Sequence, residues 1–276
     1  MSTMRRRTFL LGGAVAATGA AAIGYKLLPD SAKMLLGNYR ILPGRVPLLV
    51  ERDFGWRGAD FAAGGTKTVD LKALAPPIFR DRPNSVATLA NILGPCDAER
   101  VPRRIDISEG RPGLPMRLSL RVVGAATGKA YENAEVQIWH VNAKGIYSGQ
   151  DVSRECTFDD PDAMSGLAFR GRQFTDRDGV VTFLTVYPGW YSGRSIHVHV
   201  RVVVDGRELL VTQLFFDDLL SDAVYGSHPD YESRPPRNTR NDRDFFSPRA
   251  YLNAHIFDFE KLDGGVLQAT YTVGVA

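Results

Sequence analysis

Two histidines separated by a single residue are the feature of the sequence with the clearest potential for chemistry. His197 and His199 lie in the segment 195–201, where apolar and polar residues alternate. This alternation predicts a β-strand, and both imidazoles then project from the same face of that strand. Two imidazoles placed in this way can bind one metal ion, but an isolated His-x-His pair is equally compatible with one buried structural histidine and one solvated histidine. The neighbouring residues have to decide between these two interpretations.

Six short segments between Gly94 and the C-terminus have distinctive sequences: residues 104–113, 133–140, 145–149, 188–191, 194–199 and 212–216. In this order they resemble segments of the intradiol ring-cleavage dioxygenases, a family of non-haem ferric enzymes that open catechol rings. The short connection between Tyr191 and Arg194 is similar to that of the exported, single-domain branch of the family, whereas the cytoplasmic enzymes have longer insertions. Residues 25–83 lie outside the resemblance.

The resemblance implies an iron site with four protein ligands. Tyr147 and His199 would be the equatorial ligands. Tyr191 and His197 would be the axial ligands, and Tyr191 would be released when substrate binds. The chemistry of Fe(III) agrees with this set, because a hard cation prefers anionic oxygen, and two phenolates with two neutral imidazoles suit it better than they suit zinc. Two tyrosinates and a hydroxide would also cancel the charge of the ion, so the site could be buried without a large desolvation cost.

Two further residues would act beside the metal. Arg194 would point at the substrate ring, where its guanidinium stabilises developing negative charge without losing a proton. Gln213 matches a glutamine of the family and would hold Arg194 or a metal ligand in place. The remaining histidines, His140, His228 and His255, lie outside the ligand pattern and are interpreted as structural.

The implied function is that of an oxidoreductase that opens a catechol-type ring with O2 to give a cis,cis-muconate-type product. The sequence leaves open which catechol is the substrate and whether the chain forms oligomers. One alternative is a β-sandwich that binds zinc or copper without oxygenase chemistry, and colour would separate the two because Fe(III)-bound tyrosinate absorbs visible light. A second alternative is a β-sandwich that binds a carbohydrate or a cell surface. A binding protein of this kind would have no need for Arg194 and Gln213 beside two tyrosines and two histidines.

Alternating residues predict six short β-strands, at 116–122, 135–140, 180–186, 196–204, 208–216 and 266–275. Asp178-Gly179 and Asp205-Gly206 supply turns, and the second pair lies directly between two strands, as in a tight hairpin. Several strands without a long helix between them predict an all-β fold, namely an antiparallel β-sandwich with an irregular N-terminal extension. One short helix is expected over residues 84–93.

The first residues of the chain indicate export. Three arginines at positions 5–7 precede an apolar run rich in alanine and glycine, which resembles a twin-arginine signal. The run is short and weakly apolar for a spanning helix, so we expect a periplasmic or extracellular protein without a stable membrane span. The expected organisation is a signal segment at 1–24, the extension at 25–83 and a catalytic β-sandwich domain at 84–276.

Composition and charge narrow the range of partners. The chain has 276 residues, 44% of them hydrophobic and 24% charged, which is ordinary for a globular protein. Its formal net charge of +3 is accounted for by the arginines at 5–7, and the rest of the chain is close to neutral. Nucleic-acid binding is therefore not expected, because it needs a concentrated basic surface. Cys96 and Cys156 could form a disulfide or remain a free, buried pair.

Overall fold

The computed structural model divides the chain into two compact units, Met1–Gly55 and Trp56–Ala276. The residues that it describes are 40–41, 50–51, 56–79, 87–248, 252 and 254–276. In the first unit, strands β1 (Arg40–Ile41) and β2 (Val50–Glu51) pair antiparallel. The signal segment predicted at residues 1–24 lies outside the described residues.

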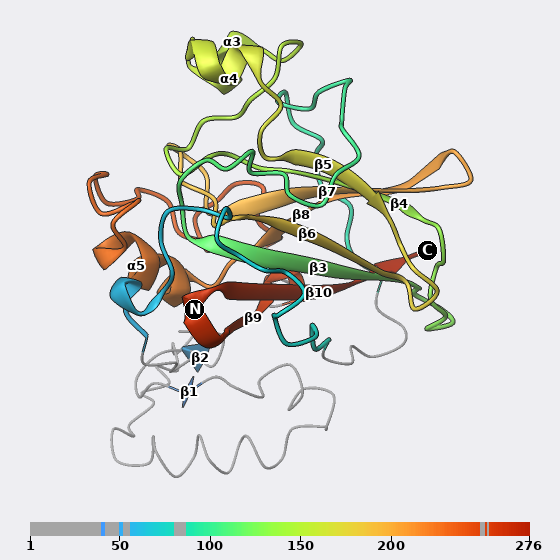
Figure 1. Cartoon of the computed structure of the whole chain (residues 1–276). Coiled ribbons are helices and arrows are strands. Elements are labelled where there is room, and N and C mark those ends of the chain that lie inside the picture. The colour runs from blue at the N-terminus through green and yellow to red at the C-terminus, as the bar shows by residue number, and fades with distance from the viewer. Residues whose placement is uncertain (1–39, 42–49, 52–55, 80–86, 249–251, 253) are drawn as a thin grey trace, which may run out of the picture. The chain divides into compact units, whose positions relative to one another are not determined.

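The second unit is built on two four-stranded β-sheets, which form the layers of a sandwich (Figure 1). One sheet contains, in spatial order, β6 (Val180–Val186), β3 (Pro115–Gly124), β10 (Leu267–Val275) and β9 (Asp258–Lys261). The other contains β5 (Arg170–Phe174), β4 (Glu135–Trp139), β7 (His197–Val204) and β8 (Arg207–Phe215). The predicted all-β sandwich is confirmed.

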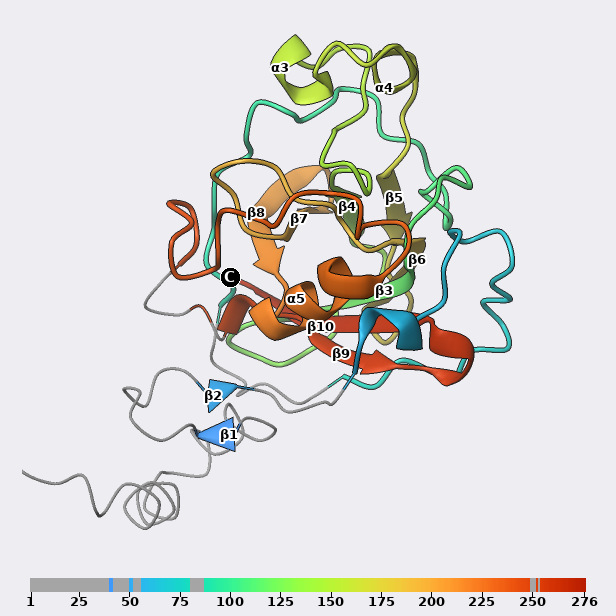
Figure 2. The same ribbon diagram turned by 90° about the vertical axis from the view of Figure 1, so that its left-hand side faces the viewer.

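The helices are short and lie outside the two sheets. They are η1 (Gly58–Asp60), α3 (Arg154–Thr157), α4 (Pro161–Ser165), α5 (Asp218–Ser227) and η3 (Asp263–Gly265). Helix α5 lies at one end of the sandwich, while α3 and α4 lie together beyond the sheet that contains β5 (Figures 1 and 2). Among the described residues, none of the helices has the length and apolar character needed to cross a membrane.

The alternation along β7 separates an apolar face from a face that carries chemistry. Val200 is fully buried on one face, whereas His197 and His199 lie on the opposite face. The register extends both faces onto β4, because Val200 lies beside Ile138 and His199 lies beside Trp139. The sequence pattern of these strands thus places the two histidines next to the aromatic side chain of Trp139.

Residues 56–79 pack along the sheet that contains β3. The guanidinium of Arg117 in β3 donates hydrogen bonds to the carbonyl oxygens of Leu74 and Ala75. The hydroxyl of Thr270 in β10 donates to the carbonyl of Ile78 at 3.0 Å. These contacts cover polar side chains that an uncovered sheet would expose to water, so β3 is buried on both faces.

The directions of the strands follow from how they are connected. Asp205 and Gly206 have φ values of 50° and 75°, the left-handed pair that a tight hairpin needs, and they join β7 to β8 in antiparallel pairing as predicted. In contrast, β10 pairs parallel with β3, although an antiparallel sandwich was expected. A long stretch of chain separates these two strands, so no hairpin dictates their direction.

The helix predicted over residues 84–93 is wrong in its described part. Residues 87–93 are neither helix nor strand. Their N–H groups bond to strands: Thr88 donates to the carbonyl of Gly274 and Asn91 donates to that of Val211, both at 2.8 Å. Bonds to neighbouring strands replace the local bonds that a helix would have formed.

His140 gives the fold a testable dependence on pH. Its Nδ1 lies 2.7 Å from the carbonyl oxygen of Val141 and its Nε2 lies 2.8 Å from Oγ1 of Thr185. Burial lowers the pKa of His140 from 6.5 to about 4. Between these two pH values the unfolded chain therefore binds a proton more readily than the folded protein. As the pH falls through this window, the free energy of unfolding decreases, by about 3 kcal/mol in total.

We expect urea unfolding of the metal-free protein to show this loss between pH 6.5 and pH 4. The variant His140→Gln should show a shallower pH dependence, because its side chain does not titrate. In addition to burial, the charge of His140 lowers the pKa values of His197 and His199, so the difference between the two slopes measures His140 together with its effect on these two residues. Equal slopes would contradict the assignment.

Candidate active site

The side chains of Tyr147, Tyr191, His197 and His199 converge on one small volume. The Oη of Tyr147 lies 3.2 Å from Nε2 of His197 and 3.1 Å from Nε2 of His199. The Oη of Tyr191 lies 3.5 Å from the Oη of Tyr147 and 3.2 Å from Nε2 of His197. The structure thus brings together all four residues that the sequence interpretation selected as metal ligands.

Both histidines turn Nε2 toward this volume, and the tautomer of His197 is fixed by its other ring nitrogen. Nδ1 of His197 lies 2.7 Å from the carbonyl oxygen of Ser195, which can only accept, so Nδ1 carries the proton and Nε2 does not. The His199 ring is stacked on Trp139, with centroids 4.7 Å apart. Burial, followed by the charge of Arg194, lowers the pKa of His197 to about 3. Burial also lowers the pKa of His199 well below its ordinary value.

Tyr147 lies in a loop after β4 that is fixed from two sides. The side-chain oxygen of Asn142 accepts hydrogen bonds from the N–H groups of Lys144 at 2.9 Å and Ile146 at 3.0 Å. The N–H of Tyr147 donates to the carbonyl of Cys156 in α3 at 3.0 Å. The position of the first phenol therefore depends on α3 as well as on its own turn.

Tyr191 lies in a second loop, after β6, which is tied to the first loop. Gly145 has a φ of +81°, and a Cβ added to it would lie 2.0 Å from the carbonyl oxygen of Trp190, so only glycine permits this approach. Arg234 bridges the two loops by donating to the carbonyl of Trp190 at 2.7 Å and to that of Ala143 at 3.3 Å. These contacts hold the two tyrosines in a fixed relation.

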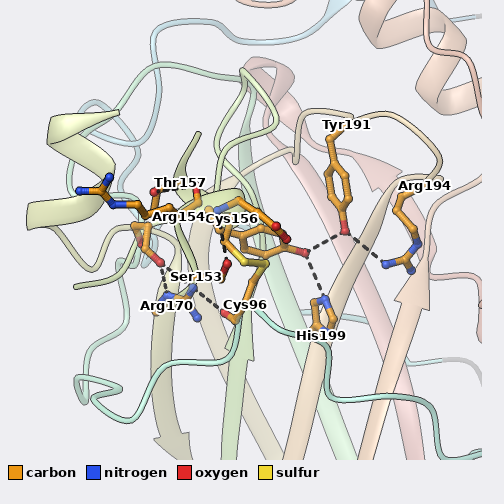
Figure 3. Close-up of a disulfide and its surroundings, with 12 residues drawn as sticks. Cys96, Ser153, Arg154, Cys156, Thr157, Arg170, Tyr191, Arg194 and His199 are labelled. Carbon is orange, nitrogen blue, oxygen red and sulfur yellow. Dashed lines mark hydrogen bonds between the residues drawn. A yellow bond between two sulfur atoms is a disulfide. The ribbon is translucent and has the colours of Figure 1, made fainter. Parts of the chain in front are cut away.

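A disulfide between Cys96 and Cys156 packs with Tyr147 at one side of the site (Figure 3). The sequence left the state of Cys96 and Cys156 open, and the structure pairs them. The segment that leads to Cys96 runs beside His199, since a Cβ added to Gly94 would lie 3.3 Å from Cε1 of His199. The disulfide thus joins this segment to α3, whose Cys156 carbonyl holds Tyr147.

Arg170 is a buried cation beside the cluster that sequence reasoning missed. It is 1% exposed, and it donates from Nη2 to the carbonyl of Cys96 at 2.7 Å and from Nε to that of Ser148 at 2.8 Å. Its guanidinium carbon lies 5.9 Å from the centroid of the Tyr147 ring. Burial lowers the pKa of Arg170 to about 10, so the side chain remains a cation at neutral pH.

Arg194 is fixed beside Tyr191 by several partners. Its Nη1 donates to Oη of Tyr191 at 3.2 Å, and its Nη2 donates to Oε1 of Gln213. Gln213 is fully buried, and its own Nε2 donates to the carbonyl of Ile92 at 3.1 Å. Of the two roles considered for Gln213, the structure shows the contact with Arg194. The Nε of Arg194 donates to Asp244, a residue that no sequence motif indicated.

The other three histidines are buried away from this set of contacts. His140 bonds to Val141 and Thr185 as described above, and Nε2 of His228 lies 2.8 Å from the carbonyl oxygen of Ala62. Within the described part of the chain, no group of three or more His, Cys, Asp or Glu side chains could hold a metal ion. A metal held at the cluster would therefore need its two phenols as ligands.

The cluster is a set of uncharged donors in the metal-free protein. Burial raises the pKa of Tyr147 well above its ordinary value. Burial also raises the pKa of Tyr191, although the Arg194 guanidinium opposes the increase. Two neutral phenols and two neutral imidazoles can together accept a cation, and a cation at this point would remove the phenol protons.

Comparison with known proteins identifies the family. The family model named Dioxygenase matches residues 93–230, which is half of the chain. The chain therefore belongs to the intradiol ring-cleavage dioxygenases, and the resemblance found in the sequence is confirmed.

The proteins similar to the chain are named for different ring-cleavage reactions. The chain is 27% identical to a chlorocatechol 1,2-dioxygenase of Rhodococcus opacus, over 47% of this chain and 56% of the relative. It is 29% identical to the beta chain of a protocatechuate 3,4-dioxygenase of Burkholderia cepacia, over 51% of this chain and 62% of the relative. An intradiol ring-cleavage dioxygenase of Tetranychus urticae, of known structure, is 29% identical and superimposes with a TM-score of 0.60, covering 68% of this chain and 94% of that one. The chain spans less than two thirds of the length of the two curated relatives.

The disulfide gives a prediction for stability. A cross-link between cysteines 60 positions apart restricts the unfolded chain, which corresponds to about 4 kcal/mol in the chain-entropy treatment. We expect the double variant Cys96→Ala/Cys156→Ala to lose about this much free energy of unfolding in urea denaturation. Reductant should destabilise the parent protein and leave the variant unchanged. Equal stability of the oxidised and reduced parent protein would contradict the prediction.

Proposed function

We propose that the chain is a non-haem Fe(III) intradiol dioxygenase that opens catechol-type rings with O2 and yields cis,cis-muconate-type products. The proposal rests chiefly on the convergence of two phenol oxygens and two imidazole nitrogens, 3.1–3.5 Å apart, in one buried volume. Membership of the family supports an oxidoreductase that acts on aromatic compounds. Relatives named for chlorocatechol and protocatechuate support a catechol-type substrate but do not select one.

The donor set of the cluster fits ferric iron. Phenolate oxygen is a hard, anionic ligand and imidazole is a common ligand of iron, so Tyr147, Tyr191, His197 and His199 together match this ion. The bond from Nδ1 of His197 to the Ser195 carbonyl fixes the imidazole with Nε2 toward the cluster, which is how metal-binding histidines are oriented. When bound, ferric iron would supply the Lewis acidity that deprotonates phenols and catechol, and the electronic activation needed for reaction with O2.

Tyr191 is the tyrosine better placed to leave when substrate enters. It is partly exposed, whereas Tyr147 is 3% exposed. Ser192 and Gly193 next to it are exposed, and a Cβ added to Gly193 would meet no atom within 4 Å. As a phenolate, Tyr191 could take a proton from a catechol hydroxyl and leave as a neutral phenol, while its Oη remains within reach of Nη1 of Arg194. The same open loop leaves room for substituted catechols, so we propose modest discrimination among them.

Arg194 would act on the substrate as a fixed cation. Its guanidinium is held beside Tyr191, at the edge of the volume that the substrate oxygens would enter. A guanidinium keeps its proton and has its donors in one plane, so it can stabilise negative charge that develops on the ring without reorganising. Gln213 would preserve that orientation through its contact with Nη2.

We propose further that the protein is exported, with a signal at residues 1–24, an extension at 25–83 and the catalytic domain at 84–276. The arginines at 5–7 and the apolar run after them support a twin-arginine-type signal. The disulfide supports an oxidising location such as the periplasm or the cell exterior. Mass spectrometry of the protein recovered from each cell fraction tests this, and an uncleaved cytoplasmic product would contradict it.

The metal assignment predicts colour and stoichiometry. We expect the iron-loaded protein to contain about one ferric ion per chain and to be red to burgundy, because tyrosinate bound to Fe(III) absorbs visible light. His199→Ala should lose most of the iron and the colour, whereas His228→Ala, outside the cluster, should keep both. Elemental analysis and visible spectra measure the two properties. A colourless zinc protein with full ring-opening activity would contradict the proposal.

The role of Arg194 predicts a loss of turnover without a loss of metal. Arg194→Lys keeps a positive charge but lacks the planar set of donors that faces Tyr191 and Gln213. We expect iron content and colour to be retained, while kcat for catechol falls by about two orders of magnitude or more. Oxygen uptake and iron content should be measured on the same sample. Unchanged turnover would show that Arg194 does not act on the substrate.

A further inference from the structure

Asp244 is a buried carboxylate on the inner side of Arg194. It lies in the segment between α5 and β9, about fifty residues after the arginine, and its side chain has no exposed surface. Nε of Arg194 lies 3.0 Å from Oδ2 and 3.2 Å from Oδ1 of Asp244. The side chain of Arg194 is 12% exposed, so the ion pair is almost completely screened from water.

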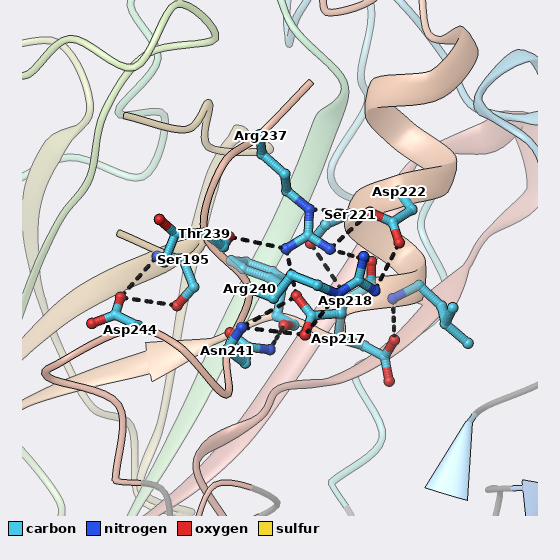
Figure 4. A network of polar contacts seen from close by, with 12 residues as sticks. Ser195, Asp217, Asp218, Ser221, Asp222, Arg237, Thr239, Arg240, Asn241 and Asp244 are labelled. Atoms are coloured by element: carbon cyan, nitrogen blue, oxygen red, sulfur yellow. Dashed lines mark hydrogen bonds and ion pairs between the residues drawn. The ribbon is translucent and has the colours of Figure 1, made fainter. Parts of the chain in front are cut away.

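The carboxylate of Asp244 has further donors around it. Oδ2 accepts from the N–H of Ser195 at 2.8 Å and from its hydroxyl at 3.0 Å (Figure 4), and Oδ1 accepts from the N–H of Phe246 at 2.8 Å. Burial opposes ionisation, but the Arg194 guanidinium and these two N–H groups outweigh it and hold the pKa of Asp244 below its ordinary value. An anion is therefore built into the site directly behind Arg194.

The contacts of Arg194 leave one nitrogen of its guanidinium, Nη1, to face the substrate. Asp244 occupies Nε and Gln213 occupies Nη2, while Nη1 faces Tyr191. The ring of Phe246 lies 5.0 Å from the guanidinium carbon and limits movement out of the plane. Because the guanidinium is rigid, fixing Nε and Nη2 also fixes the direction of Nη1.

We propose that Asp244 is the positioning residue that aims Nη1 of Arg194 at Tyr191 and at the incoming catechol. This inference rests on the proposed function, in which Arg194 acts on the substrate. Gln213 alone could not perform this task, because an uncharged amide at Nη2 leaves the buried guanidinium without a counter-ion. Asp244 supplies both the charge and the second fixed point.

A purely structural role for Asp244 has to be separated from this one, since the residue also holds the main chain at Ser195 and Phe246. Asp244→Asn keeps the shape and one acceptor oxygen but removes the charge opposite Arg194. The control is Asp222→Asn. Asp222 lies on α5, and its substitution weakens ion pairs of 2.7 Å to Arg237 and 2.9 Å to Arg240, apart from Asp244 (Figure 4).

The kinetic test is a double-mutant cycle on the iron-loaded protein with catechol as substrate. We expect Asp244→Asn to lower kcat on the order of 100-fold, with iron content and colour retained and KM changed only a few-fold, because misaimed groups lose rate before they lose binding. In the Arg194→Lys background the same substitution should lower kcat by less than about threefold, since its target is already lost. Equal fold-losses in the two backgrounds, or no loss in the parent protein, would overturn the proposal.

A second measurement needs neither iron nor turnover. In nitrogen-15 correlation spectra of the metal-free protein, the Nε–H of Arg194 should give a protected signal, assigned by its absence in Arg194→Lys. Asp244→Asn should shift it and speed its exchange with water, whereas Asp222→Asn should leave it unchanged. A signal that is unchanged in Asp244→Asn would overturn the positioning role. If the parent protein fails to open catechols, the proposed function fails, and this spectrum still decides whether Asp244 holds Arg194.

Discussion

Four uncharged donor groups facing one another in a buried space are the constraint on which the rest of this structure depends. The two phenols and two imidazoles lie within 3.1–3.5 Å and form neutral hydrogen bonds, each of which contributes only about 0.5–1.5 kcal/mol. A structure keeps such groups together only when the surrounding chain holds each one in place. The most informative contacts in the protein are therefore those made behind the cluster.

Those contacts join segments that are far apart in sequence. The two histidines are placed by the period of a single strand, whereas each tyrosine lies in a loop and needs outside support. Arg234 bonds to both the loop of Trp190 and the loop of Ala143. The disulfide and Arg170 join the segment that leads to Cys96, beside His199, to the loop of Tyr147. The charged groups are also arranged around the cluster. Buried arginines lie at its sides, and the uncharged side chains lie at its centre. A cation bound at the cluster would have the two tyrosines and the two histidines around it and the Arg194 guanidinium beside Tyr191.

The parts predicted from sequence are those with local causes. The strands with an apolar alternation and the hairpin at Asp205 followed from the residues themselves. The alternation of one strand placed His197 and His199 on one face, whereas the two tyrosines were selected through the resemblance to the intradiol ring-cleavage dioxygenases. Strand β5, with the sequence RGRQF, was missed because its first arginine, Arg170, is buried by partners elsewhere in the chain, such as the carbonyl of Cys96. Asp244 was missed for the same reason, since its partner is fifty residues away and no motif surrounds it. The pairing of the cysteines depends on the same long-range geometry.

We have proposed that one ferric ion binds between Tyr147, Tyr191, His197 and His199. The most direct measurement is a crystal structure of the iron-loaded protein with anomalous scattering data collected on both sides of the iron absorption edge. We expect a single anomalous peak that appears above the edge, between the two phenol oxygens and the two Nε2 atoms. A cluster that stays empty while iron binds elsewhere, for example at surface carboxylates, would contradict it.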